Sequence, residues 1–587
     1  MSSRRHSAAL ATVAVLVTGA VLSTTLATTA FAQPEAGGSG IGGEVPGRYA
    51  DQTIAWQPCF PDGPPPGLPP GSDRLECGSF TAPLDWADPD AGGSVTIAVS
   101  RLLATDDAEP AALFTNPGGP GAAGRFVPLL FLLTDRKRVL ESQDIYGIDV
   151  RGTGASVNAS CDGGSTTGIL LDPRDRRPEQ TDLILDSAEL AARFCQHGTD
   201  GLGPFVRTDQ TVADLDLLRH LIRQEKINWL GYSGGTWLGA YYATYFPQRV
   251  GRFVLDANTA FTDPWQVVGD LQPLGFQRRY EQDFLPWAAT YDAIFGLGST
   301  AAEVNQTYED VRAALAAEPL DFGLGLAIYP VDLDGLIIGS MYSKLAFQSL
   351  AELIGFIRDE AVNRPAPEER SPLAAQQAEQ VRAKVQQMRN IRAHSGGLQP
   401  LAPDSFNATF LHILCNDTSW RGNRESLLAG SQQQGEAYPL VGWGTLSNPC
   451  ITWHRPDVSL RTPNGQGVPP VLMVQNERDP ATPIEGALRA RDGFAGARLL
   501  TVTDEGDHTT YASSSPNTCV NDAVEDYLLD GVVPEGDTSC PGNPIPPPIP
   551  VQTPDELPIV PLPLAPGDII GTAQELIAAL TELAGQP

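Results

Sequence analysis

The chain has 587 residues, 42% of them hydrophobic and 19% charged, which excludes wholesale disorder and allows several domains or one domain with a large insertion. It carries 39 basic and 70 acidic residues, a formal net charge of −31 at pH 7. Because nucleic acids and anionic membranes repel so acidic a protein, we expect neither as a partner.

The first 32 residues have the pattern of a secretory signal peptide. Arg4 and Arg5 precede an apolar stretch over residues 8–25, and Ala30-Phe31-Ala32 offers a small-x-small cleavage site. The stretch is short and broken for a membrane anchor, and no later segment could span a bilayer. We therefore expect a secreted or envelope-associated protein, with no membrane span in the mature chain.

All eight cysteines lie after the predicted cleavage site, and their number is even. In an exported protein such cysteines form disulfides by default. Their order along the chain suggests four local pairs: Cys59 with Cys77, Cys161 with Cys195, Cys415 with Cys450, and Cys519 with Cys540. No Cys-x-x-Cys or Cys/His cluster has the spacing of a zinc site, so we expect no metal.

Strands and helices alternate in the first half of the chain, after a flexible lead-in over residues 33–50. This alternation predicts an α/β fold, a mostly parallel central sheet with helices on both faces. The expected strands are residues 94–104, 111–116, 143–150, 227–230 and 252–258, and the expected helices are residues 212–225 and 236–247.

The alternation then stops and later resumes. Residues 261–405 are mostly helical in pattern, with an exposed helix over 370–390, whereas strands return at 468–479 and 497–508. We interpret this as a helical cap inserted between two parts of one core, residues 51–260 and 406–540. A proline-rich tail, residues 541–587, follows and ends in a short amphipathic helix over 567–585, and this tail could associate with the cell envelope.

The sequence GYSGGTW, residues 231–237, lies between a predicted strand and a predicted helix. It matches G-x-S-x-G, in which a serine on a strained strand-to-helix turn projects its hydroxyl and small neighbours relieve the crowding. We predict that Ser233 is a nucleophile. The alternative is a structural serine in a glycine-rich turn.

A nucleophilic serine needs a base and an acid that orients it, and in this kind of site they follow in the order serine, acid, histidine. His508 is the only histidine after Asp479, and both come at the ends of predicted strands. We predict that His508 is the base and Asp479 the acid. Three other carboxylates compete with Asp479 for that role: Glu477, Asp504 and Asp507.

The stretch NPGGPGAAG, residues 116–124, begins at the end of the expected strand over residues 111–116. Its glycines allow backbone amides to approach a substrate closely. This kind of site takes one oxyanion donor from such a loop and one from the residue after the nucleophile. We predict Gly119, or else Gly118, together with Gly234.

Several of these motifs occur together in one family. GGPG after the strand over 111–116, DVRGTGAS at the end of the strand over 143–150, GYSGGT, DPATP, GDH and VEDYLLDGVVPEGDTSC, in this order, resemble the secreted tripeptidyl-aminopeptidase branch of the α/β hydrolases, a relative of the prolyl aminopeptidases. The resemblance covers residues 50–540. It implies a serine peptidase with a helical cap that removes short peptides or single residues from free N-termini, without a cofactor.

Some positions depart from that family. The chain has GPGAAG where relatives often have GPGGSG, GDH where GHG is commoner, and no cysteines in the cap. In related aminopeptidases acidic groups near the cap hold the substrate's ammonium, which makes Glu281, Asp283 and Glu477 candidates here. For each of the three, an ordinary solvated surface position is the alternative.

Two other functions use the same residues. An esterase or lipase would employ the same serine, histidine and aspartate, because an ester is the easier substrate for them. A non-catalytic envelope protein would keep the scaffold and bind partners through its proline-rich tail.

Overall fold

The computed structural model describes residues 45–106, 110–199, 201–321, 327–363 and 404–549. The predicted signal peptide, the predicted helix over 370–390 and the predicted C-terminal helix over 567–585 lie outside the described residues. The lead-in is described only from residue 45, and the proline-rich tail only as far as residue 549.

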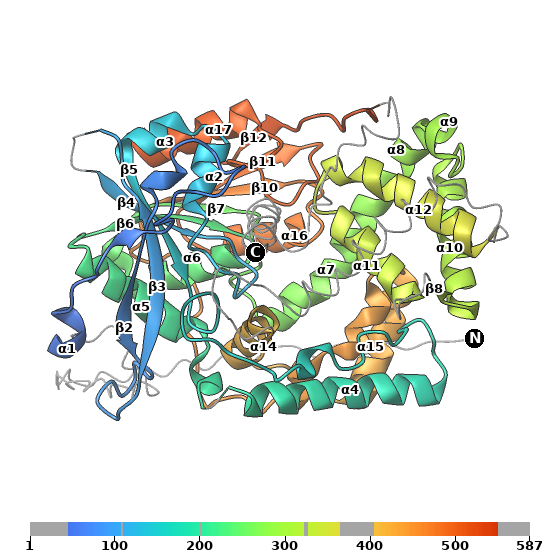
Figure 1. Ribbon diagram of the computed structural model, residues 1–587, viewed down its shortest axis with the longest axis horizontal. Coiled ribbons are helices and arrows are strands. Elements are labelled where there is room, and N and C mark those ends of the chain that lie inside the picture. The colour runs from blue at the N-terminus through green and yellow to red at the C-terminus, as the bar shows by residue number, and fades with distance from the viewer. Residues whose placement is uncertain (1–44, 107–109, 200, 322–326, 364–403, 550–587) are drawn as a thin grey trace, which may run out of the picture. The chain divides into compact units, whose positions relative to one another are not determined.

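Ten strands form one central sheet in the order β1-β2-β3-β5-β4-β6-β7-β10-β11-β12 (Figure 1). The pairs β1–β2, β2–β3 and β3–β5 are antiparallel, and every pair from β5 to β12 is parallel. The strands are β1 (Gln57–Pro58), β2 (Glu76–Pro83), β3 (Ser94–Leu102), β4 (Ala111–Asn116), β5 (Gln143–Asp149), β6 (Ile227–Tyr232), β7 (Val250–Asp256), β10 (Val471–Asn476), β11 (Ala497–Thr503) and β12 (Thr538–Pro541).

Side chains of the parallel strands alternate between two hydrophobic cores, one on each face of the sheet. In β10, Val471 and Met473 enter one core while Leu472 and Val474 enter the other. All four are fully buried, as expected for a strand with helices on both sides. This is why strands such as VLMVQ are continuously apolar rather than alternating with polar residues.

Helices cover both faces, as the alternation predicted. One face is packed by α5 (Thr208–Leu221), α6 (Gly234–Tyr245) and α16 (Ile484–Gly493). The other face is packed by α2 (Pro128–Leu133), α3 (Lys137–Ser142) and α17 (Thr518–Glu525), the last continued by a π-helical turn over Asp526–Asp530 (Figure 1). A short helix, α1 (Gly47–Ala50), precedes the sheet.

The segment between β7 and β10 is mainly helical and has a hydrophobic core of its own, separate from the two cores of the sheet. A two-stranded hairpin, β8 (Leu320–Asp321) with β9 (Ala327–Ile328), was not predicted. The helices are α7 (Trp265–Arg279) with a π-helical turn (Tyr280–Phe284), α8 (Leu285–Thr290), α9 (Asp292–Phe295), α10 (Ala301–Ala317), α11 (Pro330–Ser340), α12 (Phe347–Ala361), α14 (Ser405–Asp417) and α15 (Arg424–Ala437).

A long helix that the sequence patterns did not indicate, α4 (Pro178–His197), follows β5. The disulfide Cys161–Cys195 ties its last turn to the preceding loop. The other three disulfides are also between cysteines consecutive along the chain: Cys59–Cys77, Cys415–Cys450 and Cys519–Cys540. The eight cysteines therefore pair in the sequential order that was expected.

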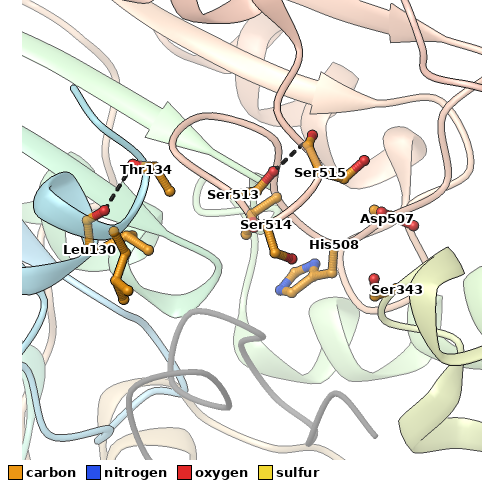
Figure 2. A pocket seen from close by; sticks show the side chains of 10 residues that line it. Leu130, Thr134, Ser343, Asp507, His508, Ser513, Ser514 and Ser515 are labelled. Atoms are coloured by element: carbon orange, nitrogen blue, oxygen red, sulfur yellow. Dashed lines mark hydrogen bonds between the residues drawn. The ribbon is translucent and has the colours of Figure 1, made fainter. Parts of the chain in front are cut away.

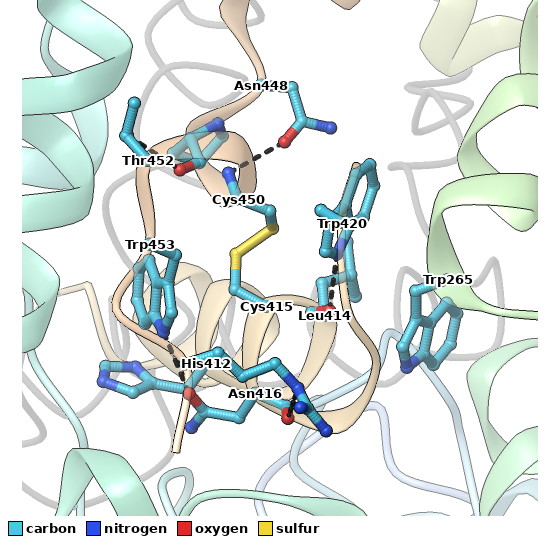
Figure 3. The surroundings of a disulfide bond; sticks show 12 residues. Trp265, His412, Leu414, Cys415, Asn416, Trp420, Asn448, Cys450, Thr452 and Trp453 are labelled. Atoms are coloured by element: carbon cyan, nitrogen blue, oxygen red, sulfur yellow. Dashed lines mark hydrogen bonds between the residues drawn. A yellow bond between two sulfur atoms is a disulfide. The ribbon is translucent and has the colours of Figure 1, made fainter. Parts of the chain in front are cut away.

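The disulfide Cys415–Cys450 joins α14 to a 3₁₀ turn among several aromatic side chains (Figure 3). His412, one turn earlier on α14, packs edge-on against Trp453, and burial lowers its pKa to about 4. Asp417, at the end of α14, accepts hydrogen bonds from the backbone N–H and hydroxyl of Thr208 at 2.8 and 2.6 Å. These contacts attach α14 to the first residue of α5, on the core.

Within the described residues, no helix combines the length and the apolar composition needed to cross a membrane.

Candidate active site

The register of the parallel strands brings four loops to one edge of the sheet. Asn116 lies beside Gly231, and Asp256 lies between Tyr232 and Val474. Because these residues end β4, β6, β7 and β10 or lie next to their ends, the loops after those strands begin side by side. The loop that contains His508 follows β11, whose Val502 pairs with the last residue of β10. This is the carboxyl edge, where open parallel sheets place their sites.

Ser233 stands on a strained turn between β6 and α6. Its backbone has φ 53° and ψ −121°, a left-handed φ that costs a non-glycine residue about 1–3 kcal/mol. Its N–H donates to the Asp256 carbonyl at 2.9 Å, and its carbonyl accepts from the Thr236 hydroxyl at 2.6 Å. A side chain at Gly235 would lie 2.7 Å from the Asn116 carbonyl oxygen, so the turn needs its small neighbours. This is the geometry that GYSGGT predicted.

The His508 ring is held by Asp479. Its Nδ1 lies 2.9 Å from both carboxylate oxygens of Asp479, and both side chains are fully buried. Asp479 is fixed in turn by the N–H groups of Ala481 and Thr482 and by the Thr482 hydroxyl. The other ring nitrogen of His508, Nε2, has no hydrogen-bond partner among the described residues. With Nδ1–H facing a carboxylate, Nε2 is the nitrogen available to take up a proton.

In the described part of the chain, none of the three competing carboxylates forms a hydrogen bond with the His508 ring. Glu477 is exposed and accepts from the Asp504 N–H. The Asp504 side chain is 91% exposed and pairs with Arg478. The Asp507 carboxylate accepts instead from Arg279 and from the Lys344 N–H. Asp479 is therefore the carboxylate that the geometry places on His508.

The loop after β4 touches the turn of Ser233. A Cβ on Gly118 would lie 2.8 Å from the Gly234 nitrogen and 3.0 Å from the Ser233 Cβ, and one on Gly234 would lie 3.0 Å from the Gly119 carbonyl carbon. The Gly118 N–H is already bonded to the Asn116 side chain at 2.9 Å. Of the two glycines that the sequence left open, Gly119 is thus the one whose amide is not committed to that bond.

The three candidates for binding an ammonium are differently placed. Asp283 is buried, and its carboxylate forms ion pairs with Arg279 at 2.5 Å and Arg478 at 2.9 Å. Glu281 and Glu477 are exposed, and Glu281 accepts from the Gln277 amide. None of the three lines the cavity beside His508. The charge of Asp283 is already balanced by its own arginines.

A buried ionic network next to His508 was missed by sequence reasoning. Arg279, on α7, reaches Asp507 at 2.6 Å, and the Lys344 ammonium reaches Glu505 at 2.5 Å. Burial, and the neighbouring charge of Glu505, raise the pKa of Asp507 to about 6. The His508 N–H also donates to the Tyr342 carbonyl at 2.8 Å. The helical insertion therefore holds the histidine loop directly, through partners more than 160 residues away.

A cavity of about 170 Å³ opens beside His508 (Figure 2). It is lined by polar side chains from the histidine loop and the insertion, and by α2: Leu130, Leu133, Thr134, Ser343, Asp507, His508, Thr509, Ser513, Ser514 and Ser515. A larger hollow of about 880 Å³ is lined by residues of α4, α7, α11, α14 and α15. In the described parts of the chain, no three His, Cys, Asp or Glu side chains gather as metal ligands would.

Comparisons with known proteins agree with this fold. Residues 112–301 match the family described as alpha/beta hydrolase fold, and residues 438–540 match the family described as TAP-like protein. A tripeptidyl aminopeptidase of Streptomyces lividans is 30% identical over 92% of this chain and 98% of its own length. The serine protease Hip1 of Mycobacterium tuberculosis is 26% identical over 83% of this chain and 91% of its own. Carboxylesterase B of the same species is 28% identical over 79% of this chain and 86% of its own length.

The fold and the matches define an α/β hydrolase, and the protein is an enzyme of the serine hydrolase class. Within that superfamily the chain belongs to the tripeptidyl-aminopeptidase branch, as the motifs had suggested.

Proposed function

We propose that this protein is a secreted serine peptidase that cleaves peptides near their free N-termini, with Ser233 as nucleophile, His508 as base and Asp479 as the acid that orients it. The observation that carries the proposal is the pair of His508 and Asp479, whose 2.9 Å contact leaves Nε2 unpartnered among the described residues. Its place on the sheet edge that also bears the strained turn of Ser233 supports the assignment.

The reaction follows from these positions. The Ser233 oxygen attacks the carbonyl carbon of the scissile peptide, and its proton passes to Nε2 of His508. The carbonyl oxygen becomes an oxyanion that accepts from the N–H groups of Gly119 and Gly234. The imidazolium, stabilised by Asp479, then donates its proton to the departing amine, which leaves an ester of Ser233. Water activated by the same ring hydrolyses that ester.

Each part has an expected share in the rate. Two preorganised amide donors contribute about 100–1,000-fold each in a serine peptidase. Loss of the orienting carboxylate costs about 10⁴-fold, because the imidazole then adopts the wrong tautomer. The same machinery hydrolyses esters, so the peptide preference must come from binding outside these residues.

The organisation of the chain supports cleavage at chain ends. We assign the core to residues 51–260 and 406–540, the cap to residues 261–405 and the tail to residues 541–587. A cap over the carboxyl edge restricts entry to a chain terminus, which gives exopeptidase behaviour. Export by the first 32 residues accords with four disulfides, since such bonds persist in oxidising compartments.

The first experiment labels the purified mature protein with a fluorophosphonate and locates the label by peptide mass mapping. We expect label on Ser233 and none in Ser233→Ala or His508→Ala. Absence of label on folded, disulfide-intact protein would favour the non-catalytic envelope protein instead.

The second experiment separates a peptidase from an esterase, an alternative favoured by the similarity to carboxylesterase B. The substrates are a tripeptide amide with a free amine, the same amide acetylated, and a short acyl ester. We expect cleavage of the free amide and at least tenfold less of the acetylated one. Hydrolysis of the ester alone would make the protein an esterase.

A further inference from the structure

Asp256 is a buried carboxylate that the proposed reaction does not use. It is the last residue of β7, and its backbone pairs with Tyr232 of β6 on one side and Val474 of β10 on the other. Its exposed fraction is 1%. Among the described residues, no arginine or lysine forms an ion pair with Asp256. A buried carboxylate of this kind needs hydrogen bonds, and its hydrogen-bond partners indicate what the residue does.

The bonds of Asp256 reach both sides of the site. Its carbonyl accepts from the Ser233 N–H at 2.9 Å. Its Oδ2 accepts from the N–H groups of Thr510 at 3.0 Å and Tyr511 at 2.8 Å, which lie two and three residues after His508. One residue thus joins the nucleophile's turn to the histidine loop.

The histidine loop needs such an anchor because of its backbone. Thr509 has φ 77° and Ala512 has φ 52°, left-handed values that non-glycine residues avoid. The two N–H groups bonded to Asp256 lie between these two residues. Hydrogen bonds from backbone amides to a carboxylate are among the strong ones, so Asp256 can hold this strained stretch in one conformation.

Asp256 also adds charge near His508. Burial raises the pKa of Asp256 to about 7, and the negative charge of Asp479 acts in the same direction. The hydrogen bonds from Tyr511 and Thr510 and the charge of His508 oppose this rise. Tyr232, on the neighbouring strand, is a further titratable group that interacts with Asp256. Above about pH 7, where Asp256 is charged, its carboxylate is a second negative group that stabilises the imidazolium formed during the reaction.

We propose that Asp256 is a positioning residue that fixes the histidine loop relative to Ser233 and favours the charged form of His508. This inference rests on the proposed function for the pair of Ser233 and His508, and not on the peptide as substrate.

Two substitutions separate position from charge. Asp256→Asn keeps an oxygen that can accept from Thr510 and Tyr511 but removes the charge, whereas Asp256→Ala removes both. The matched control is Asp417→Asn, because Asp417 is equally buried, accepts a backbone N–H and a hydroxyl of Thr208, and lies outside the site. Folding of each variant is followed by circular dichroism and thermal melting.

The readout is the rate constant of fluorophosphonate labelling as a function of pH. We expect Asp256→Ala to label about 100-fold more slowly, as a misplaced catalytic group does. We expect Asp256→Asn to label more slowly by a smaller factor, with the larger loss above about pH 7, where the carboxylate of Asp256 is charged. Asp417→Asn should label like the wild type.

Wild-type rate and profile in Asp256→Asn would overturn the proposal, as would equal losses in Asp256→Asn and Asp417→Asn. If Asp256→Ala does not fold, Asp256→Asn decides alone. Labelling depends on the serine and histidine but not on a peptide substrate. If the wild type is labelled but cleaves no peptide, the proposed peptidase activity is refuted, while the labelling rates of the Asp256 variants still test the role of Asp256.

Discussion

Replacing Gly118 by alanine tests how closely the glycine-rich loop over residues 116–124 must approach Ser233, the proposed nucleophile. The added Cβ would fall against the Tyr232 carbonyl oxygen, 2.8 Å from the Gly234 nitrogen and 3.0 Å from the Ser233 Cβ. Carbon atoms in contact prefer about 3.5–4.0 Å, so the loop must withdraw by about 0.5–1 Å. Backbone cannot rotate away as a side chain can.

The withdrawal carries the neighbouring Gly119 amide with it. A displacement of about 1 Å costs roughly 100-fold in rate, and complete loss of one oxyanion donor costs about 100–1,000-fold. Gly118 also has φ 96°, which alanine adopts only with strain, so overpacking and strain together should lower the free energy of unfolding by about 2–4 kcal/mol.

The assay compares kcat/KM on a free tripeptide amide with urea unfolding of the same protein. The control is Gly339→Ala on α11, where a Cβ meets no atom within 4 Å. In a helix this change should stabilise by about 0.5–1 kcal/mol and leave kcat/KM unchanged. If Gly118→Ala keeps wild-type activity and stability, the close packing of this loop against Ser233 does not matter to the reaction.

Three further predictions concern single side chains. Asp479→Asn should lower kcat by about 10⁴-fold with little change in melting temperature, and a loss below tenfold would contradict its orienting role. Arg279→Met leaves the buried Asp507 without its arginine and Asp283 with Arg478 alone, and should cost about 3–5 kcal/mol in urea unfolding, whereas Arg489→Met, in a half-exposed pair, should cost under about 1 kcal/mol. Burial raises the pKa of Asp417 to about 6 from an unfolded value of 3.8, so its contribution to stability is present at low pH and is lost as pH rises through this window. Asp417→Asn should remove about 3 kcal/mol of this decline in urea unfolding between pH 4 and 7, and an unchanged slope would show that Asp417 does not titrate there.

The elements that the sequence predicted well are those whose pattern is local. The strands β4, β5 and β10 each contain a short apolar run, and the structure places them within a few residues of their predicted ends. GYSGGTW carries its own context of strand and helix, so the turn of Ser233 could be predicted from seven residues. The sequential disulfides followed from cysteine order.

Elements that depend on distant partners were not predictable. Helix α4 has three exposed apolar side chains, Leu183, Leu190 and Phe194, which blur its amphipathic period. Helix α5 begins at Thr208 rather than at residue 212, because the distant Asp417 accepts a hydrogen bond from the Thr208 N–H. No local pattern indicates a partner 209 residues away.

The sequence alone determined the class of fold, the turn of Ser233 and the order of the candidate residues, because glycine spacing, hydrophobic runs and residue order are properties of short segments. Only the tertiary structure decided that Asp479 rather than Asp507 contacts His508, that the Gly118 amide is already bonded, and that Asp256 joins the two halves of the site. Most of these contacts join residues far apart in the sequence. The register of the strands determines which hydrogen-bonding groups lie together at one edge of the sheet.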